Sequence, residues 1–570
     1  MKLDKISFTS GAIIHVSRTV TAVVGPNNAG KSTVLRELKQ AFDRHAYQGP
    51  IEEFKIINGY GMGREAGVEA LIQEISESYP LRPAGQHPEG FFQEPTWRFA
   101  NGVTLASAQV AQLWSSDLGL GSLASYFCTL LDATSRLNIA NTTASYNAVS
   151  ESPSQPVQRL YADRNLESAL SLLTVRAFGV PVTVNRYAGS QIMVHVGAPT
   201  TPESVAPQTE DYLRELAALP LIDEQGDGFK AFVGIVLSVL AGAYPLVLID
   251  EPEAFLHPPQ ARLLGQFLAE QHSNGRQVIV STHSEDIVAG LTGARGSGTT
   301  LVRLTRDGAI NSVAQLSAES VQNLYEDPLM RYYDMLNGLF VRGVIVCEAD
   351  SDCTYYRAVL EELDKADGAD SGLHFSHTGG KARVHVAVDA FKQSRVPVAA
   401  ILDIDFLQND NEFSRLVSAA GGDPSSFIRN RNVVVSAVQD RNQNQSVVAA
   451  RAEILAHLDT VTGNVTSALV SKINDSIKGR SGWKEFKRQG KRMLSGEALS
   501  AYNNLDHDLK TLGIFMVPEG ELERFHPLVS ASNKAHWLRQ VLESEAYKTA
   551  TEAKTFLQEV RVFATQQQTA

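Results

Sequence analysis

Residues 25–32 read Gly25-Pro-Asn-Asn-Ala-Gly30-Lys31-Ser32, and this stretch decides the fold of the N-terminal half. It matches the pattern GxxxxGK[ST] between an expected strand, Thr19–Val24, and an expected helix from Ser32 to about His45. Glycines let backbone N–H groups close around phosphates, and the helix N-terminus adds a positive dipole. Lys31 would reach the β- and γ-phosphates, and Ser32 would ligate Mg²⁺. The predicted ATP-binding residues are Gly25, Asn27, Asn28, Ala29, Gly30, Lys31, Ser32, Thr33 and Asp250.

Two acids follow a second apolar run, Leu246–Ile249, which is typical of a buried strand. Asp250 would bind the nucleotide's Mg²⁺ through water, and Glu251 would polarise the attacking water. A third apolar run, Val278–Ser281, ends shortly before His283. Together with the phosphate loop, these positions predict ATP hydrolysis as well as ATP binding.

In this order His283 resembles the switch histidine of ABC-type ATPases, which contacts the γ-phosphate, and Glu253 and His257-Pro258 resemble the segment after that family's acidic strand. Gly226–Lys230 occupies the place of the ABC signature, although it departs from the LSGGQ consensus. Heads of this family bind nucleotide between two protomers. The resemblance therefore implies a homodimer or a higher homo-oligomer that forms through the ATPase heads.

A second group of carboxylates follows the ends of two apolar runs in the C-terminal half: Glu348, Asp350, Asp352, Asp403 and Asp405. Adjacent parallel strands would deliver these acids into one crevice. Clustered carboxylates suit Mg²⁺ or Mn²⁺, which prefer oxygen ligands. Two such ions can activate water and stabilise the leaving oxygen during phosphodiester hydrolysis. The pattern predicts a metal-dependent nuclease centre.

This arrangement resembles the Toprim domain of the OLD (overcoming lysogenisation defect) nuclease family, in which an ABC-type head precedes Toprim. Gly379-Gly380-Lys381 and the acidic segment with Glu521 and Glu523 also resemble that family. Ala349 stands where the family usually has glycine. Glu521 and Glu523 remain alternative metal ligands, with Glu523 favoured, and Lys534 lies where the family often has a catalytic lysine.

The resemblance implies two sets of site residues. The expected catalytic residues are Glu251, His283, Glu348, Asp403, Asp405 and Lys534. The expected metal ligands are Ser32, Asp250, Glu348, Asp352, Asp403, Asp405, Glu521 and Glu523. The cofactors would be ATP and Mg²⁺ or Mn²⁺ at both the ATPase and the Toprim sites.

The expected fold is α/β, with an ABC-type P-loop ATPase head followed by a Rossmann-like Toprim domain. Residues 1–325 would form the head, with insertions at about 80–220, because loop-forming residues dominate 80–120 and 140–160. Residues 326–570 would form the Toprim domain, with a helical insertion at about 411–510 and a last strand at Gly513–Val517.

The net charge of −12 argues against a general nucleic-acid coat protein, but a short basic stretch near residue 485 offers a local grip on phosphates. Trp483 and Phe486 lie within it and could stack on bases. The expected nucleic-acid-binding residues are Lys381, Lys484, Lys487, Arg488, Lys491 and Arg492.

The composition is that of an ordinary globular protein, with 43% hydrophobic residues and three scattered cysteines without CxxC spacing. No apolar run long enough to cross a membrane and no signal peptide is apparent, so we expect a cytoplasmic protein. The leading hypothesis is an ATP-regulated endonuclease, on DNA rather than RNA, with the defence role against phage implied by the resemblance and a partner protein or RNA left open. The alternatives are a toxin-like effector that cuts RNA such as tRNA, and a DNA-binding sensor with an inactive Toprim domain.

Overall fold

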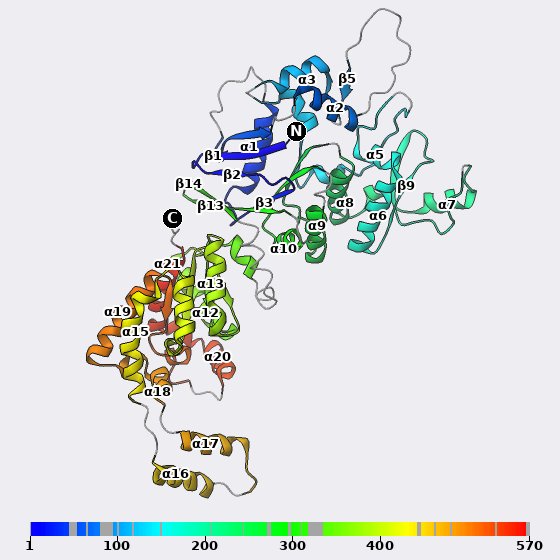
Figure 1. Ribbon diagram of the computed structural model, residues 1–570. Helices are drawn as coiled ribbons and strands as arrows, with labels where there is room; N and C mark the ends of the chain where they lie inside the picture. The colour runs from blue at the N-terminus through cyan, green and yellow to red at the C-terminus, as the bar shows by residue number, and fades with distance from the viewer. Residues whose placement is uncertain are drawn as a thin grey trace, which may run out of the picture. The chain divides into compact units, whose positions relative to one another are not determined.

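The computed structural model divides the chain into two compact units, Met1–Tyr325 and Glu326–Ala570, each considered by itself below (Figure 1). The structure describes residues 2–44, 54–63, 67–79, 95–99, 102–116, 119–148, 151–205, 207–242, 244–270, 275–293, 298–308, 310–316, 335–441, 446–460, 463–478, 481–529 and 533–565. No helix within these ranges is long and apolar enough to cross a membrane.

The first unit is built on a six-stranded sheet whose strands are parallel except for the last pair. Its order is β7 (Cys128–Leu131), β11 (Leu246–Asp250), β12 (Gln277–Ser281), β3 (Val20–Val24), β13 (Thr300–Asp307) and β14 (Ile310–Leu316). Every residue of β3, β11 and β12 is buried. These strands are therefore nearly continuous apolar runs, as expected for parallel strands covered on both faces.

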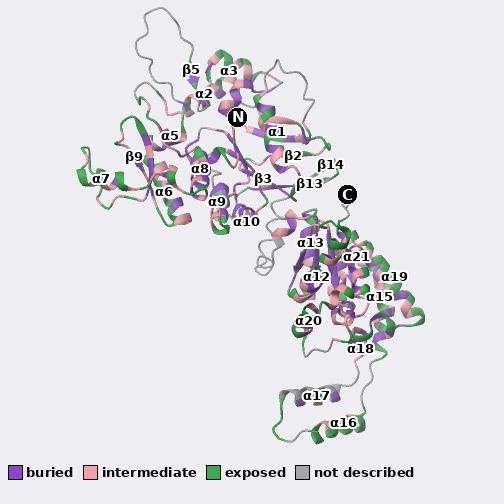
Figure 2. Ribbon diagram, turned by 180° about the vertical axis from the view of Figure 1, so that it is seen from behind, coloured by how far each residue is buried: buried purple, intermediate pink, exposed green. Residues whose placement is uncertain are grey.

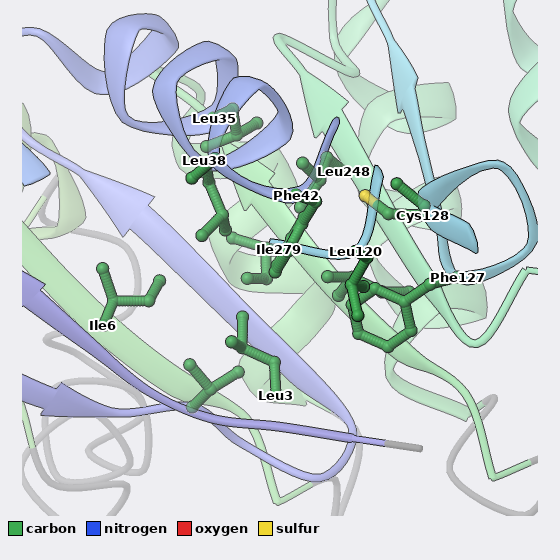
Figure 3. Packing of buried hydrophobic residues seen from close by; sticks show 14 of the residues in the cluster. Leu3, Ile6, Leu35, Leu38, Phe42, Leu120, Phe127, Cys128, Leu248 and Ile279 are labelled. Atoms are coloured by element: carbon green, nitrogen blue, oxygen red, sulfur yellow. The ribbon is translucent and has the colours of Figure 1, made fainter. Parts of the chain in front are cut away.

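Around the central sheet, α1 (Lys31–Asp43), α9 (Pro258–Glu270) and α10 (Glu285–Gly293) follow β3, β11 and β12, and α8 (Asp227–Leu240) comes before β11. A second, antiparallel sheet has the order β2 (Ile13–His15), β1 (Lys2–Phe8) and β4 (Ile57–Gly63). Residues of α1, of β1 and of the central sheet share one core, in which Leu38, Phe42, Leu3 and Leu248 are fully buried (Figure 3). This core holds α1 against the strands whose ends carry the site.

The stretch expected as insertions contains more regular structure than its loop-forming composition indicated. Its elements are β5 (Thr96–Arg98), β6 (Thr104–Ala106), α3 (Ser107–Trp114), α5 (Pro156–Ala162), α6 (Arg164–Phe178), β8 (Thr143–Ala144), β9 (Val182–Asn185), β10 (Gln191–Val196) and α7 (Glu210–Ala218). Strand β7 also lies within it, yet β7 is the edge strand of the central sheet. Residues 80–94 lie outside the described part. Trp97 of β5 and Trp114 of α3 are buried, so these short elements are packed against the rest of the unit.

The second unit contains a four-stranded parallel sheet with the order β16 (Leu373–His377), β15 (Gly343–Cys347), β17 (Val398–Leu402) and β18 (Ile514–Met516). Helices α12 (Asp350–Asp367), α20 (Lys534–Glu543) and α21 (Thr551–Thr565) share one core with the sheet, and α13 (Val384–Gln393) packs against β15 and β17. The sequence did not predict β16, because this edge strand is only partly buried and is interrupted by polar residues.

Between β17 and β18 the chain forms the expected helical insertion: α14 (Asp410–Ala419), α15 (Pro424–Gln439), α16 (Val447–Asp459), α17 (Ser467–Lys478), α18 (Gly482–Gln489) and α19 (Gly496–Thr511). Helix α16 has no buried residue and is coloured as exposed in Figure 2. Helices α15, α18 and α19 instead bury apolar residues. Both units are therefore of the expected α/β type, each with helices around a largely parallel sheet.

Candidate active sites

The phosphate loop of the first unit is shaped by residues with positive φ. Gly25 has φ 144°, and a Cβ added there would lie 2.0 Å from the carbonyl oxygen of Leu304. Gly30 has φ 94° and caps α1, and Asn28 has φ 63°. Only glycine fits the first of these positions, because any side chain would collide with backbone. Of the other predicted ATP-binding residues, Asn27 is exposed, Ala29 is buried, and Ser32 and Thr33 are half-buried in the first turn of α1.

Lys31 lies folded over this loop. Its Nζ donates hydrogen bonds to the carbonyl oxygens of Gly25 and Pro26, each at 2.9 Å. Burial lowers the pKa of Lys31, and the negative charge of Glu251 opposes that effect. The ammonium group thus occupies the concavity of the loop, where the motif predicts that it meets phosphate oxygens.

Asp250 ends β11 and is held from several sides. Its carboxylate accepts a hydrogen bond from the Ser281 hydroxyl and lies 3.7 Å from an Arg36 nitrogen. Its carbonyl oxygen accepts a hydrogen bond of 3.0 Å from Nη1 of Arg136, a fully buried side chain just after β7. The sequence did not predict this role for Arg136, because no local pattern shows that an arginine will contact the end of a strand far along the chain.

Glu251 and His283 lie together beyond the ends of β11 and β12. Glu251 has φ 48°, an uncommon value for a residue with a side chain. Its backbone N–H donates to the carbonyl oxygen of Ser281 at 2.9 Å. His283 Nδ1 lies 3.6 Å from Glu251 Oε1 and 3.1 Å from Glu253 Oε1. Burial raises the pKa of Glu253, whose carboxylate also accepts from the His283 backbone N–H at 2.9 Å. Glu253 therefore orients the histidine towards Glu251.

Gly226–Lys230 does not precede a helix as a separate segment. Helix α8 begins at Asp227, and Gly226 is its N-cap. The stretch in the place of the ABC signature is therefore largely the first turn of α8.

In the second unit, Glu348 follows β15 and Asp403 and Asp405 follow β17, the neighbouring parallel strand. One carboxylate oxygen from each of the three lies within 4.8 Å of the others. The Asp403 backbone N–H donates to Glu348 Oε1 at 3.0 Å. Burial and then the charge of Asp403 raise the pKa of Glu348 to about 8, and burial also raises the pKa of Asp403. Three converging carboxylates that repel one another form a donor set suited to a hard divalent cation.

Asp352 lies in the first turn of α12 and has two other partners. Its Oδ2 accepts from the Ala349 backbone N–H at 3.1 Å, and its Oδ1 forms an ion pair of 2.6 Å with Lys534. Ala349 is in extended conformation, with φ −136°, so this turn does not require glycine. Burial alone would lower the pKa of Lys534. The negative charges of Asp352 and Asp403 outweigh this effect, so the pKa is raised. Lys534 therefore lies beside one of the acids that follow β15, and its catalytic role stays a prediction.

Glu521 and Glu523 follow β18, the strand next to β17. Glu521 pairs with Arg524 at 3.1 Å, and burial, followed by the charge of Glu523, raises its pKa. Within the described residues, the three-carboxylate group comprises Glu348, Asp403 and Asp405, without Asp352, Glu521 or Glu523. The geometry favours neither of the two glutamates as a further ligand.

Two lysines that the sequence assigned to nucleic acid contact the acids. Lys487 Nζ lies 3.2 Å from Asp403 Oδ2 and 3.5 Å from Asp405 Oδ2. Lys381 Nζ lies 3.3 Å from Asp405 Oδ2. Burial alone would lower the pKa of Lys487. The negative charges of the two aspartates outweigh this effect, so the pKa is raised. The helical insertion thus contributes directly to the acidic centre.

The rest of the basic stretch lies on the surface, where Lys484, Arg488, Lys491 and Arg492 are exposed. Arg488 pairs with Glu485 at 2.6 Å, and Arg492 pairs with Glu519 at 3.1 Å.

The expectation that its aromatic residues could stack on bases is wrong. Trp483 is 8% exposed and Phe486 is 0% exposed, because they form the apolar face of α18 and their ring centroids lie 5.8 Å apart.

Two family models match the chain in the same order as the two sites. Residues 20–289 match the AAA domain described as putative AbiEii toxin, Type IV TA system, and residues 339–405 match the TOPRIM domain of overcoming lysogenization defect-like proteins. The chain therefore contains an ATPase domain of this type followed by an OLD-like Toprim domain.

Among characterised relatives, the chain is similar to the Old nuclease of Escherichia phage P2. The two are 22% identical over 450 residues, which cover 69% of this chain and 75% of the phage protein. An uncharacterised protein of Methanocaldococcus jannaschii is 33% identical over 107 residues, or 18% of this chain and 90% of that protein.

Solved structures of SMC head domains also match. The head domain from Thermotoga maritima has a TM-score of 0.29 and 16% identity. This match covers 56% of the present chain and 100% of the Thermotoga chain. The head from Pyrococcus furiosus, bound to the C-terminal domain of ScpA, has a TM-score of 0.32 and 11% identity. This match covers 57% of the present chain and 98% of the Pyrococcus chain. At such scores the fold assignment rests on the family matches and on the strand order.

Proposed function

We propose that this protein is an ATP-hydrolysing, divalent-metal-dependent endonuclease that cleaves DNA. The observation that carries the proposal is the convergence of Glu348, Asp403 and Asp405 at the ends of two adjacent parallel strands, in a domain of the OLD-like Toprim type. The ATPase site lies in the other unit and has its own acids, so the two activities use separate residues.

In the ATPase site, Lys31 would release its hydrogen bonds to the carbonyl oxygens of the loop and bind phosphate oxygens of ATP instead. Ser32 and Asp250 would hold the nucleotide's Mg²⁺, and Arg136 and Ser281 keep Asp250 in place. Glu251 would accept a proton from the attacking water, with His283 beside it. Heads of ABC type bind nucleotide between protomers, so we propose that the protein acts as a homodimer or a higher homo-oligomer.

In the nuclease centre, Glu348, Asp403 and Asp405 would hold Mg²⁺ or Mn²⁺, with Asp352 and either Glu521 or Glu523 as further ligands. The bound metal would supply activation of water and stabilisation of the leaving oxygen. Lys534 would bind the phosphate that is cleaved, since it is already ordered by Asp352. Lys484 and Lys491, which are exposed on the helical insertion, would hold the neighbouring backbone phosphates.

Defence against phage is the role we propose for this activity, inside the cytoplasm and with a partner protein or RNA as a possible activator. A second candidate, an effector that cuts RNA such as tRNA, is favoured by the description of the matching ATPase family as a putative toxin. A sensor with an inactive Toprim domain is less well supported, because the half-buried acids converge with lysines beside them.

The test is cleavage of plasmid, linear DNA and tRNA by the full-length protein, with Mg²⁺ or Mn²⁺ and with or without ATP. We expect the DNA to be cut, and Glu348→Gln to lose cutting while it keeps ATP hydrolysis. Cleavage of tRNA alone would support the RNA effector. No cleavage of any substrate, or equal cleavage by Glu348→Gln, would contradict the nuclease assignment.

A further inference from the structure

Lys487 differs from the other basic residues of its stretch because its ammonium group lies among acids. The side chain is 30% exposed, against 60% for Arg488 and 67% for Arg492. It contacts Asp403 and Asp405 together, whereas Lys381 pairs with Asp405 and Lys534 with Asp352. Lys487 is therefore the cation that bridges the two aspartates of the three-carboxylate group.

The backbone around Lys487 is built for this position. Gly520 has φ 106°, and a Cβ added there would lie 2.1 Å from the carbonyl oxygen of Lys487. The carbonyl oxygen of Gly520 in turn accepts from the Ile404 N–H at 3.0 Å. Ile404 stands between the two aspartates. The end of α18, the turn after β18 and the acidic segment after β17 are thus joined through one glycine.

A second residue of the helical insertion fixes the same acidic segment. Arg431 of α15 is buried, and its Nε donates to the carbonyl oxygen of Leu407 at 3.0 Å. Its Nη1 also pairs with Asp410 at 2.8 Å. The insertion therefore supports the segment that carries Asp405 and supplies a lysine to its carboxylate, so the position of Lys487 is not that of a mobile surface side chain.

Electrostatics gives this lysine a role in the absence of metal. Glu348, Asp403 and Asp405 bring negative charge into a poorly solvated site, where unpaired carboxylates destabilise the fold. An ammonium group 3.2 Å and 3.5 Å from two of them offsets that repulsion. A divalent cation on the same carboxylate oxygens would carry twice that charge at short range, and the two cations would repel each other.

We propose that Lys487 is the resident counter-cation of the nuclease centre, which a divalent cation must displace in order to bind. Lys487 acts on the metal through Asp403 and Asp405, so it is a positioning residue that sets the metal affinity of the site. This inference rests on the proposed function, since it takes the three acids as the metal ligands.

The experiment is a calorimetric titration of Mn²⁺ into nucleotide-free, metal-stripped full-length protein. Lys487→Met should bind Mn²⁺ about tenfold or more tightly than the wild type, because a close competing charge is gone. Lys487→Arg keeps the charge and should stay near the wild-type affinity. Lys365→Met is the matched control, since it removes an exposed lysine that pairs with Glu362 on α12 and should leave the affinity unchanged.

A second measurement is the melting temperature without metal, which Lys487→Met should lower and which Mn²⁺ should restore by a larger margin than in the wild type. Lys487→Gln repeats the loss of charge with a polar side chain, in case the methionine variant folds poorly. Equal or weaker Mn²⁺ affinity in both neutral variants would overturn the inference alone, provided that Asp403→Asn abolishes binding in the same assay. Wild-type protein that binds no Mn²⁺, or binds it equally after Asp403→Asn, would overturn the proposed function as well.

Discussion

The ATPase site and the nuclease centre both place acids at the ends of parallel strands, but they obtain their cations in different ways. In the first unit Lys31 comes from the loop that it serves and donates to Gly25 and Pro26 of the same motif. In the second unit Lys487 and Lys534 come from segments far along the chain from Asp403 and Asp352. One site is a local motif, whereas the other is assembled by the fold.

The largest effect that tests this comparison is expected in the nuclease centre. Asp403→Asn should reduce cleavage about a thousandfold, because losing a metal ligand removes several kilocalories per mole of transition-state stabilisation. ATP hydrolysis should persist, since its acids lie in the other unit. Both rates are measured on the same folded preparation. A parallel loss of both activities would show that the two sites are not independent.

In the ATPase site, Glu251→Gln should slow ATP hydrolysis about a hundredfold or more while nucleotide binding is retained, because a general base contributes that much. Lys31→Ala should instead abolish tight binding, since it removes the cation of the phosphate loop. Equilibrium binding of a fluorescent ATP analogue and steady-state phosphate release separate the two effects. Wild-type hydrolysis by both variants would refute the assignment of this site.

The contrast between the sites also explains what could be predicted from the sequence. The phosphate loop, β11 with Asp250 and β15 with Glu348 were predictable, because a buried apolar strand that ends in a functional residue leaves a local pattern. Helix α13 and strand β17 were predictable for the same reason. The strands are continuous apolar runs in which every residue is buried, and α13 buries Val384, Val388 and Phe391 at helical spacing.

Contacts between distant segments were not predictable in the same way. Arg136 under Asp250 and Arg431 under Leu407 are recognisable only when the fold brings the strands and helices together. The basic stretch shows the same limit, because its composition indicated a surface while the helical spacing of Trp483 and Phe486 buries one face of α18. Lys487 lies on the side of that helix which meets the acids, and no local pattern separates it from Lys484.

Gly520 offers a sharper test of assembly by the fold. Gly520→Ala should lower the free energy of unfolding of the second unit by about 2 kcal/mol or more, because its Cβ would collide with the carbonyl oxygen of Lys487. Gly368→Ala is the matched control. It also has positive φ, 67°, but nothing lies within 4 Å of the added Cβ, so about 1 kcal/mol is expected. Denaturant unfolding compares the two, and equal losses would mean that α18 is not held at this point.

The smallest effect concerns the exposed lysines, and it separates a surface role from the role of Lys487. Lys484→Gln with Lys491→Gln should weaken DNA binding several-fold at moderate salt. The logarithmic salt slope should fall by about 0.9 for each phosphate contact that is lost. Binding is measured with Ca²⁺ in place of Mg²⁺, so that cleavage does not interfere. The control pair, Lys365→Gln with Lys548→Gln, removes the same charge from lysines that pair with Glu362 and Glu545. An equal loss in both pairs would reflect net charge alone, whereas a loss confined to Lys484 and Lys491 would place DNA along the helical insertion.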